Sequence, residues 1–546
     1  MNPPNETNVR WDSLPEELWD YILQRIEEDH FESISLTCKL FLSITDRLRT
    51  TLTISNNAVA VSVLRRCRNI KRINLHPRFR DDLVSLIHDI STSGLPIETL
   101  DLSKQMRFPS QGLLKVRETL GKTLKTLICQ NIRSFSDEDL VVISESFPAL
   151  EELDISTFRY VERHYHCRSF RVTHVTDAGI KALASNLARL RKINVSGFHA
   201  ISEASLSALQ SNCVDLSEVH MLNCRMIFKN GIASVAQRPS LVFTDARALK
   251  RLHICHSILS DNDLLSIAEL SLPLREFRVP YCSGFSLTGL GPLLQAHPSL
   301  THLDLKGCEF LTDESMVLLA QNLCKLTHIV LSDSRLTEFT FMCLVKCCPL
   351  LVELQMINTD LGTCKDLCFR FMKSSPIRSL NVTCNNNFND ETLIQISYVC
   401  PELRTVDLSH SRGVSERGLI QLGLNCPHIR SLDVSYCGKV TGLGLVGFRK
   451  LVTLRAMNSG IGDEGLAMAV QGCGGRLRAV NLEFTKVTEY GVIVMVTGYP
   501  RLKEIKVRGK KLNRVLECEG WRQRQKYSSF IRFGGDSSGL LKRTTK

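Results

Sequence analysis

Histidine and cysteine gather in one short stretch of this sequence, and both are metal-binding residue types. His164, His166 and Cys167 lie almost side by side, and His174 follows them. Zinc binds imidazole and thiolate groups, usually from ligand pairs that are spaced along the chain. Ligands this close together crowd one another, so we favour a surface loop over a metal cluster here.

The remaining cysteines give no better indication of a metal site. Cys347 and Cys348 form one pair and Cys364 and Cys368 another, without a second pair at the spacing of a zinc ribbon. The sequence contains no G-x-S-x-G, Walker or H-E-x-x-H motif, so it indicates no catalytic nucleophile and no metalloprotease site. We therefore predict neither a metal nor a cofactor, and no motif in the sequence argues for catalysis.

A third set of candidates, His220, His253 and Arg278, is spread over three segments that an internal repeat relates. Apolar residues recur as L-x-x-L-x-L, as at 150–155 and 300–305. Most copies are 25 to 27 residues apart, within the length range of leucine-rich repeats. The seventeen first apolar positions are 70, 97, 124, 150, 190, 216, 249, 274, 300, 326, 351, 377, 403, 429, 451, 477 and 502.

Each repeat has the pattern of a short strand followed by a helix. The alternate apolar residues Leu303 and Leu305 suit a strand with one face turned inward. Thr312 or Asp313 can then cap a helix whose apolar residues recur at helical spacing. One strand and one helix cannot bury their own apolar face, so we expect the units to stack into a curved parallel α/β solenoid, a horseshoe.

This solenoid gives His220, His253 and Arg278 a common position. Each lies between the last two apolar residues of its repeat, where side chains point outward from the concave strand face. Asp and Asn dominate this position elsewhere and often bind the local backbone. Because the three basic residues depart from that habit, we predict that they contact an acidic or phosphorylated substrate segment. The alternative is a merely solvated face.

The cysteines follow the same register. Four lie eight residues after the first apolar position of a repeat, and five lie three residues before it. We expect all nine to be small buried packing residues at the turns: Cys67, Cys213, Cys224, Cys282, Cys308, Cys348, Cys400, Cys426 and Cys437. The pattern resembles the cysteine-containing leucine-rich repeats over about residues 65–510, with CPLL, CPEL and CPHI matching their closing element.

Two insertions interrupt the period, near residues 156–174 and 238–246. The first carries Arg163 and Arg168 among four aromatic residues. Basic residues interleaved with aromatic ones suit phosphate or peptide recognition. We therefore predict a rim loop in which Arg163 and Arg168 contact a partner, with a plain surface loop as the alternative.

The first fifty residues lack the repeat and form a separate module. Pro15 can open a helix whose apolar face holds Leu18, Ile22 and Ile26. A second apolar set begins at Phe31. A module this small has little core of its own, so much of its apolar surface would need a partner; the alternative is an N-terminal cap of the solenoid.

This module resembles an F-box, which binds the Skp-type adaptor of SCF (cullin–RING) ubiquitin ligases. The resemblance is carried by L-P-E-E-L-x-x-x-I-L-x-x-I followed by S-L-T-C-K-x-F-x-S-I. It implies adaptor contacts from ten residues: Leu14, Pro15, Leu18, Ile22, Leu23, Ser35, Leu36, Cys38, Lys39 and Phe41.

An F-box followed by leucine-rich repeats resembles the F-box/LRR family over nearly the whole chain, and the large repeat number is similar to that of its plant members. The resemblance implies a substrate receptor that binds the adaptor, and cullin through it, and holds a protein substrate for ubiquitin-dependent degradation. Its contribution would be effective concentration and orientation. Two alternatives stay open: a hormone-sensing F-box receptor of the same architecture, and a repeat scaffold outside any ligase.

The basic charge of the chain belongs mainly to its C-terminal end. The formal net charge is +12, but residues 501–546 alone hold 14 Lys or Arg against 4 Asp or Glu. A basic body that binds nucleic acid is therefore not indicated. We assign residues 1–50 to the F-box domain, 51–510 to the solenoid, and 511–546 to a C-terminal cap and a basic disordered tail.

The sequence contains no feature of a membrane or secreted protein, and this indicates its cellular compartment. No apolar run of about 18 residues occurs, and no apolar segment opens the chain, so we expect no membrane span and no secretory signal. We expect an intracellular protein of the nucleus or cytoplasm whose cysteines stay reduced.

Overall fold

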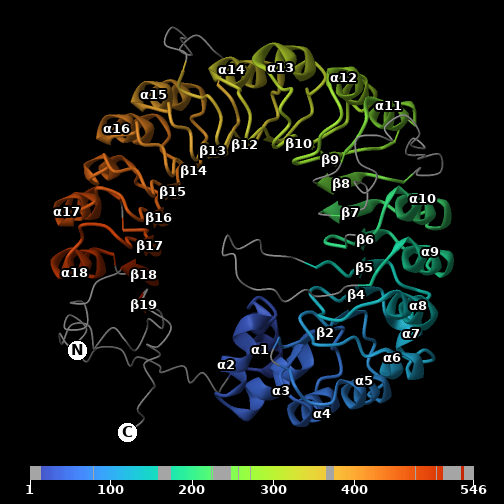
Figure 1. Cartoon of the computed structure of the whole chain (residues 1–546). Helices are drawn as coiled ribbons and strands as arrows, with labels where there is room; N and C mark the ends of the chain where they lie inside the picture. Colours follow the sequence, from blue (N-terminus) through green and yellow to red (C-terminus); the bar gives the residue numbers. More distant parts are fainter. Residues whose placement is uncertain are drawn as a thin grey trace, which may run out of the picture. The chain divides into compact units, whose positions relative to one another are not determined.

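The computed structural model divides the chain into two compact units, Met1–Ser257 and Ile258–Lys546. Within each unit the strands lie side by side and the helices line the other side of the sheet (Figure 1). The structure describes residues 14–77, 79–157, 174–198, 200–222, 224, 248–255, 258–270, 272–363, 374–473, 475–499, 501–507 and 531–533.

The first unit opens with four short helical segments. They are α1 (Glu16–Leu23), η2 (Glu28–His30), α2 (Phe31–Ser35) and α3 (Lys39–Leu48). The first helix begins one residue after Pro15, as the sequence predicts. Trp19 of α1 packs edge-on against Phe41 of α3, with ring centroids 4.8 Å apart. The guanidinium of Arg47 in α3 lies 2.6 Å from Asp20 of α1, so an apolar contact and an ion pair hold the module together.

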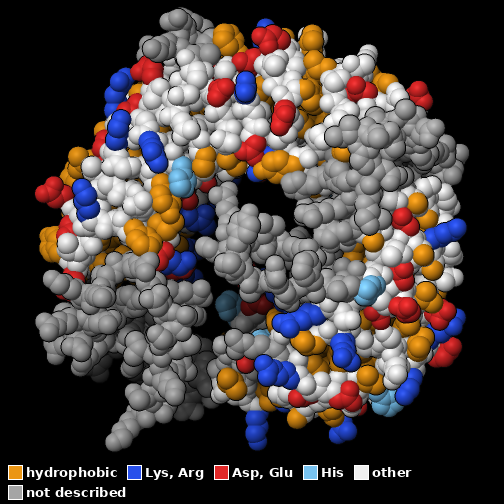
Figure 2. Space-filling model, viewed as in Figure 1, with side chains coloured by type: hydrophobic (Ala, Val, Ile, Leu, Met, Phe, Trp, Pro, Cys, Tyr) orange, Lys and Arg blue, Asp and Glu red, His pale blue; other side chains and the backbone are white. Residues whose placement is uncertain are grey.

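The repeats of the first unit contribute parallel strands that pair one after another in register. The strands are β1 (Thr51–Ile54), β2 (Arg72–Leu75), β3 (Thr99–Asp101), β4 (Thr126–Ile128), β5 (Glu152–Asp154), β6 (Lys192–Asn194), β7 (Glu218–Leu222) and β8 (Arg251–Cys255). The helices between them are α4 (Asn57–Arg66), α5 (Leu83–Thr92), α6 (Ser110–Lys115), α7 (Leu120–Thr123), α8 (Asp137–Ser146), α9 (Asp177–Asn186) and α10 (Glu203–Asn212). Figure 2 shows acidic and basic side chains intermingled over the part of this unit that carries α4–α8.

The second unit continues the same plan. Its strands are β9 (Glu276–Arg278), β10 (His302–Asp304), β11 (His328–Val330), β12 (Glu353–Gln355), β13 (Ser379–Asn381), β14 (Thr405–Asp407), β15 (Ser431–Asp433), β16 (Thr453–Arg455), β17 (Ala479–Asn481), β18 (Glu504–Val507) and β19 (Ile531–Phe533). Its helices are α11 (Asp261–Glu269), α12 (Leu287–Ala296), α13 (Asp313–Ala320), α14 (Glu338–Cys347), α15 (Asp390–Val399), α16 (Glu416–Asn425), η6 (Leu443–Gly447), α17 (Asp463–Gly472) and α18 (Glu489–Gly498). The alternation of parallel strands and helices confirms the predicted α/β repeat solenoid.

Two strands lie beyond the seventeen predicted repeats. The unit of β1 departs from the pattern because Arg49 stands where the first apolar residue is expected, although Leu52 and Ile54 are buried. At the other end, β19 pairs in parallel with β18, so the sheet continues into the segment assigned to the C-terminal cap.

The inward residues of each repeat form the core, and the register cysteines belong to it. All nine of these cysteines are buried, as predicted. The thiol of Cys437 donates to the carbonyl of Leu408 at 3.2 Å, and that of Cys426 donates to the carbonyl of Cys400 at 3.2 Å. Burial raises the pKa of Cys437 to about 12, which keeps the thiol protonated as a donor. These cysteines therefore satisfy carbonyls of the preceding repeat.

A carboxylate in the first turn of many helices joins one repeat to the next. Thr312 is the residue that caps α13, and it accepts a hydrogen bond from the amide of Ser315. Asp313 instead accepts from the next cap, Thr337, at 3.0 Å from its amide and 2.6 Å from its hydroxyl. The same contact joins Asp177 to Ser202, Asp261 to Ser286 and Asp390 to Ser415. The polar pair at each helix start thus serves two consecutive caps.

Polar contacts attach the helical module to the first repeat. Glu28 of η2 accepts from the backbone amides of Thr50 and Thr51, at 3.1 Å and 3.0 Å, where β1 begins. Asp46 of α3 accepts from the thiol of Cys67 at 3.3 Å and forms an ion pair with Arg66 at 3.2 Å. None of the helices in the described part of the chain is long and apolar enough to cross a bilayer.

Candidate protein-binding sites

The helical module presents large apolar side chains to solvent. Leu18 is 47% exposed, Tyr21 58%, Ile22 41% and Leu36 83%. The first three lie on α1 at the i, i+3 and i+4 positions, which share one side of a helix. Because burial of such residues against a partner is favourable, the module has the surface of an interaction site.

The ten residues predicted to bind an adaptor have different environments. Pro15, Leu18, Ile22, Leu36 and Lys39 are exposed, Leu14, Ser35, Cys38 and Phe41 are half-buried, and Leu23 is buried. Phe41 packs on Trp19 inside the module. The Sγ of Cys38 accepts from the amide of Phe41 at 3.4 Å and so caps α3. Leu23, Cys38 and Phe41 therefore support the module from within, while the exposed five are free to contact a partner directly.

A second site lies on the strand face of the first unit, where β7 and β8 bring His220 and His253 together. Their Nδ1 atoms are 3.0 Å apart, and the rings form a T-shaped pair with centroids 4.3 Å apart. The Nε2 of His220 lies 2.6 Å from the carboxylate of Glu218. Arg278 belongs to the second unit, where its guanidinium pairs with Glu276 at 3.3 Å.

Glu218 is the centre of this polar cluster. Its carboxylate also binds the ammonium of Lys192 at 2.8 Å and the guanidinium of Arg251 at 2.7 Å. Burial of Glu218 opposes ionisation, but the hydrogen bonds from His220, Lys192 and Arg251 outweigh it and lower the pKa of the carboxyl group. The cluster is therefore held by an ionised carboxylate at neutral pH.

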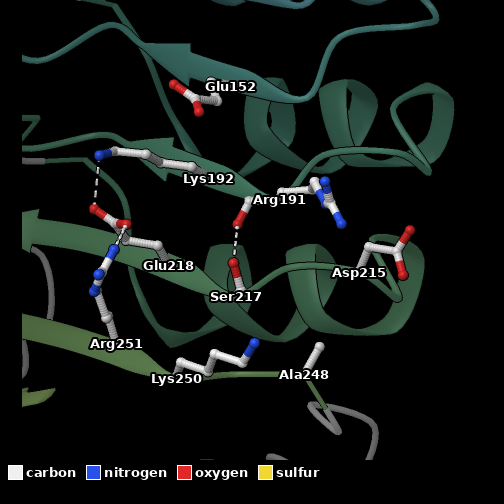
Figure 3. A pocket seen from close by; sticks show the side chains of 9 residues that line it. All are labelled: Glu152, Arg191, Lys192, Asp215, Ser217, Glu218, Ala248, Lys250 and Arg251. Carbon is white, nitrogen blue, oxygen red and sulfur yellow. Dashed lines mark hydrogen bonds and ion pairs between the residues drawn. The ribbon is translucent and has the colours of Figure 1, made fainter. Parts of the chain in front are cut away.

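A cleft of about 500 Å³ opens beside this cluster (Figure 3). Its lining is almost entirely charged or polar: Glu152, Arg191, Lys192, Asp215, Ser217, Glu218, Ala248, Lys250 and Arg251. The hydroxyl of Ser217 donates to the carbonyl of Arg191 at 3.0 Å, which ties two neighbouring repeats across the cleft. A lining of this kind suits a polar or charged protein segment better than an apolar ligand.

Sequence reasoning missed the strand position that supplies Lys192, Glu218 and Arg251. The prediction of outward-facing residues used only the position between the last two apolar residues of each repeat. The first residue of each strand points the same way, because side chains alternate along a strand. That period-2 rule was the available signal. Asp and Asn between the last two apolar residues of a repeat were predicted to bind the local backbone. This prediction is confirmed, since Asp101, Asp154 and Asp407 accept from backbone amides two residues further on.

The predicted contact residues Arg163 and Arg168 lie outside the described residues. So do His164, His166 and Cys167, which form the crowded histidine and cysteine cluster. Within the part of the chain that the structure describes, no group of three or more His, Cys, Asp or Glu side chains is arranged to hold a metal ion.

The two parts of the chain match known families. The F-box domain family matches residues 11–53, and a leucine-rich repeat family matches residues 296–320 and 425–448. The chain therefore carries an N-terminal F-box domain and leucine-rich repeats. This combination supports a substrate-recognition adaptor role for the F-box protein, and the architecture is typical of non-catalytic proteins.

Several solved structures are similar to this F-box protein. An internalin from Listeria monocytogenes is 14% identical with a TM-score of 0.42, covering 64% of this chain and 89% of its own. The Rad7–Elc1 complex from yeast is 14% identical with a TM-score of 0.41, covering 83% and 89%. The TLR13–ssRNA13 complex is 16% identical with a TM-score of 0.48, covering 85% and 68%.

Proposed function

We propose that this F-box protein is the substrate-recognition subunit of an SCF-type cullin–RING ubiquitin ligase. The F-box binds the Skp-type adaptor, which links it to cullin, and the repeats bind a protein substrate for ubiquitin-dependent degradation. The observation that carries the proposal is the exposed apolar surface of the F-box, where Leu18, Ile22 and Leu36 stand at positions that the motif assigns to the adaptor.

The protein contributes position rather than chemistry to ubiquitin transfer. The contacts of Glu28 and Asp46 with the first repeat fix the F-box on the solenoid. A substrate on the repeats is then held at a defined distance from the transferring enzyme, which raises its effective concentration there. We propose His220 and Arg278 on the strand faces, and Arg163 and Arg168 in the inserted segment, as substrate contacts. The predicted contact residue His253 is only 8% exposed, so we assign it the positioning of His220.

The adaptor interaction is tested by placing charge on the exposed F-box surface. We expect the L18D/I22D double variant to lose co-purification with a Skp-type adaptor, because burying two unpaired carboxylates costs far more than the apolar contact returns. The matched control is L318D on α13, since Leu318 is 63% exposed and lies in the second unit. L318D should co-purify with the adaptor as the unchanged protein does.

Failure of the unchanged protein to bind any Skp-type adaptor would contradict the proposal. So would binding that is equally strong in L18D/I22D and in L318D. Either result would favour a repeat scaffold outside a ligase. Circular dichroism of each variant confirms that the helices and strands are retained.

A further inference from the structure

The residues that directly precede the strands differ in charge between the two units. From β2 to β6 of the first unit this position carries alternating signs and pairs internally. Lys71 and Lys125 both lie 3.6 Å from Glu98, and Arg191 lies 3.6 Å from Glu151. The row from β2 to β6 is therefore close to self-neutralised.

In the second unit the same position is basic in five of the last six repeats before β19. We call these five residues the basic edge: Arg378, Arg404, Arg430, Arg478 and Lys503. All five are exposed, and none forms an ion pair with another described residue. The basic edge thus consists of like charges without the alternating partners seen in the first unit.

Backbone hydrogen bonds hold the basic edge in line. The amide of Arg404 donates to the carbonyl of Arg378 at 2.8 Å, and the amide of Arg430 donates to that of Arg404 at 2.7 Å. Lys503 donates to Arg478 at 2.7 Å in the same way. Parallel strands lie about 4.8 Å apart, so the cations recur at that interval within two groups, 378–430 and 478–503, which Val452 separates. Like charges directly opposite each other are destabilising, and an anionic partner would relieve that repulsion.

The surroundings strengthen the positive character of the edge. The connections into β13–β18 contain nine Lys or Arg but only two carboxylates, Glu402 and Glu504, in residues 374–379, 400–405, 426–431, 449–453, 475–479 and 501–504. The strands that follow begin with the uncharged residues Ser379, Thr405 and Ser431, which add no negative charge to the edge.

We propose that the basic edge of the second unit binds an acidic, Asp- and Glu-rich protein segment. Guanidinium groups bind carboxylates through paired, charge-assisted hydrogen bonds, which suits them to such a segment. Six strands span about 24 Å, a length that about seven residues of extended chain cover. These six stretches contain no Phe, Tyr or Trp on which a base could stack, so a protein segment fits better than a nucleic acid.

The test measures binding of the full chain to a fluorescent peptide of about twelve Asp and Glu residues by anisotropy, long enough to span the edge. We expect R404Q/R430Q to weaken binding about tenfold, because two charge-assisted contacts are lost. The matched control is K71Q/K125Q, which removes two cations from the same position in the first unit. That variant should bind as the unchanged chain does.

A second arm uses a single-stranded oligonucleotide of equal charge. The proposal is overturned if R404Q/R430Q and K71Q/K125Q bind the peptide equally, or if the unchanged chain binds the oligonucleotide through Arg404 and Arg430 but not the peptide. The measurement does not involve the F-box. If the unchanged chain binds the adaptor but not the peptide, this inference alone is wrong. If it binds the peptide but not the adaptor, only the ligase proposal is wrong.

Discussion

At the scale of single residues, Glu218 shows how one buried carboxylate organises a surface cluster. It lies within hydrogen-bond distance of His220, Lys192 and Arg251, which come from three neighbouring strands. Removal of the carboxylate would leave two cations and an imidazole without their common partner. The cluster therefore depends on one residue more than on any of the others.

We expect E218Q to destabilise the first unit by about 1–2 kcal/mol at neutral pH, a modest cost because Lys192 and Arg251 are half-exposed. The folded state lowers the pKa of Glu218 below the value of about 4.3 in an unfolded chain. Its stabilisation is therefore complete above about pH 4.3 and is lost as the pH falls from there through the folded pKa.

Urea unfolding at neutral and acidic pH measures both effects. The unchanged chain should lose more stability on acidification than E218Q does. The control is E151Q, since Glu151 forms only an exposed ion pair with Arg191 at 3.6 Å. Equal unfolding midpoints for E218Q and E151Q would contradict the role assigned to Glu218.

At the scale of elements, the contacts between successive helix starts are what lock the repeats in register. Asp313 accepts from the amide and hydroxyl of Thr337 and from the hydroxyl of Thr340 at 2.6 Å, all from the next repeat. Its neighbour Glu314 is exposed in the same turn. Two adjacent acidic residues thus have different structural consequences.

We expect D313A to destabilise the second unit by about 2–3 kcal/mol, because three donors lose a half-buried, charged acceptor. E314A should change the stability by less than about 0.5 kcal/mol, as exposed substitutions usually do. Hydrogen exchange of α13 and α14 checks the location of the effect. Protection factors that fall equally in the two variants, or in neither, would rule out the proposed role of Asp313.

Most of the strands and helices could be predicted from the sequence, because the L-x-x-L-x-L pattern marks the strand of each repeat. The position of a cysteine relative to this pattern predicts that it is buried. The sequence did not reveal β1, since Arg49 replaces an apolar residue that the edge repeat does not need to bury. Nor did it show that Thr312 caps its own helix while Asp313 binds Thr337, the cap of the next helix. That distinction depends on contacts between residues 24 positions apart, which only the stacked repeats create.

At the scale of the whole molecule, the F-box and the repeats carry separate candidate binding surfaces. The contacts of Glu28 and Asp46 hold the F-box on the first repeat, and the apolar surface of the F-box stays exposed. The candidate substrate surfaces lie on the strand faces and on the basic edge. The residues of these surfaces could be only partly predicted, because the pairing between strands decides which charged side chains form ion pairs. Lys71 pairs with Glu98, whereas Arg404 forms no ion pair with another described residue.

The most direct test of the account is a comparison of ubiquitylated proteins that co-purify with the full chain while degradation is blocked. The unchanged chain should retain a defined set of proteins in ubiquitylated form. L18D/I22D should retain the same proteins without ubiquitin, because it keeps the repeats and loses the adaptor, and R278E should retain fewer of them. If L18D/I22D retains the same proteins with the same ubiquitylation, the F-box does not connect this protein to a ligase, and the central claim is wrong.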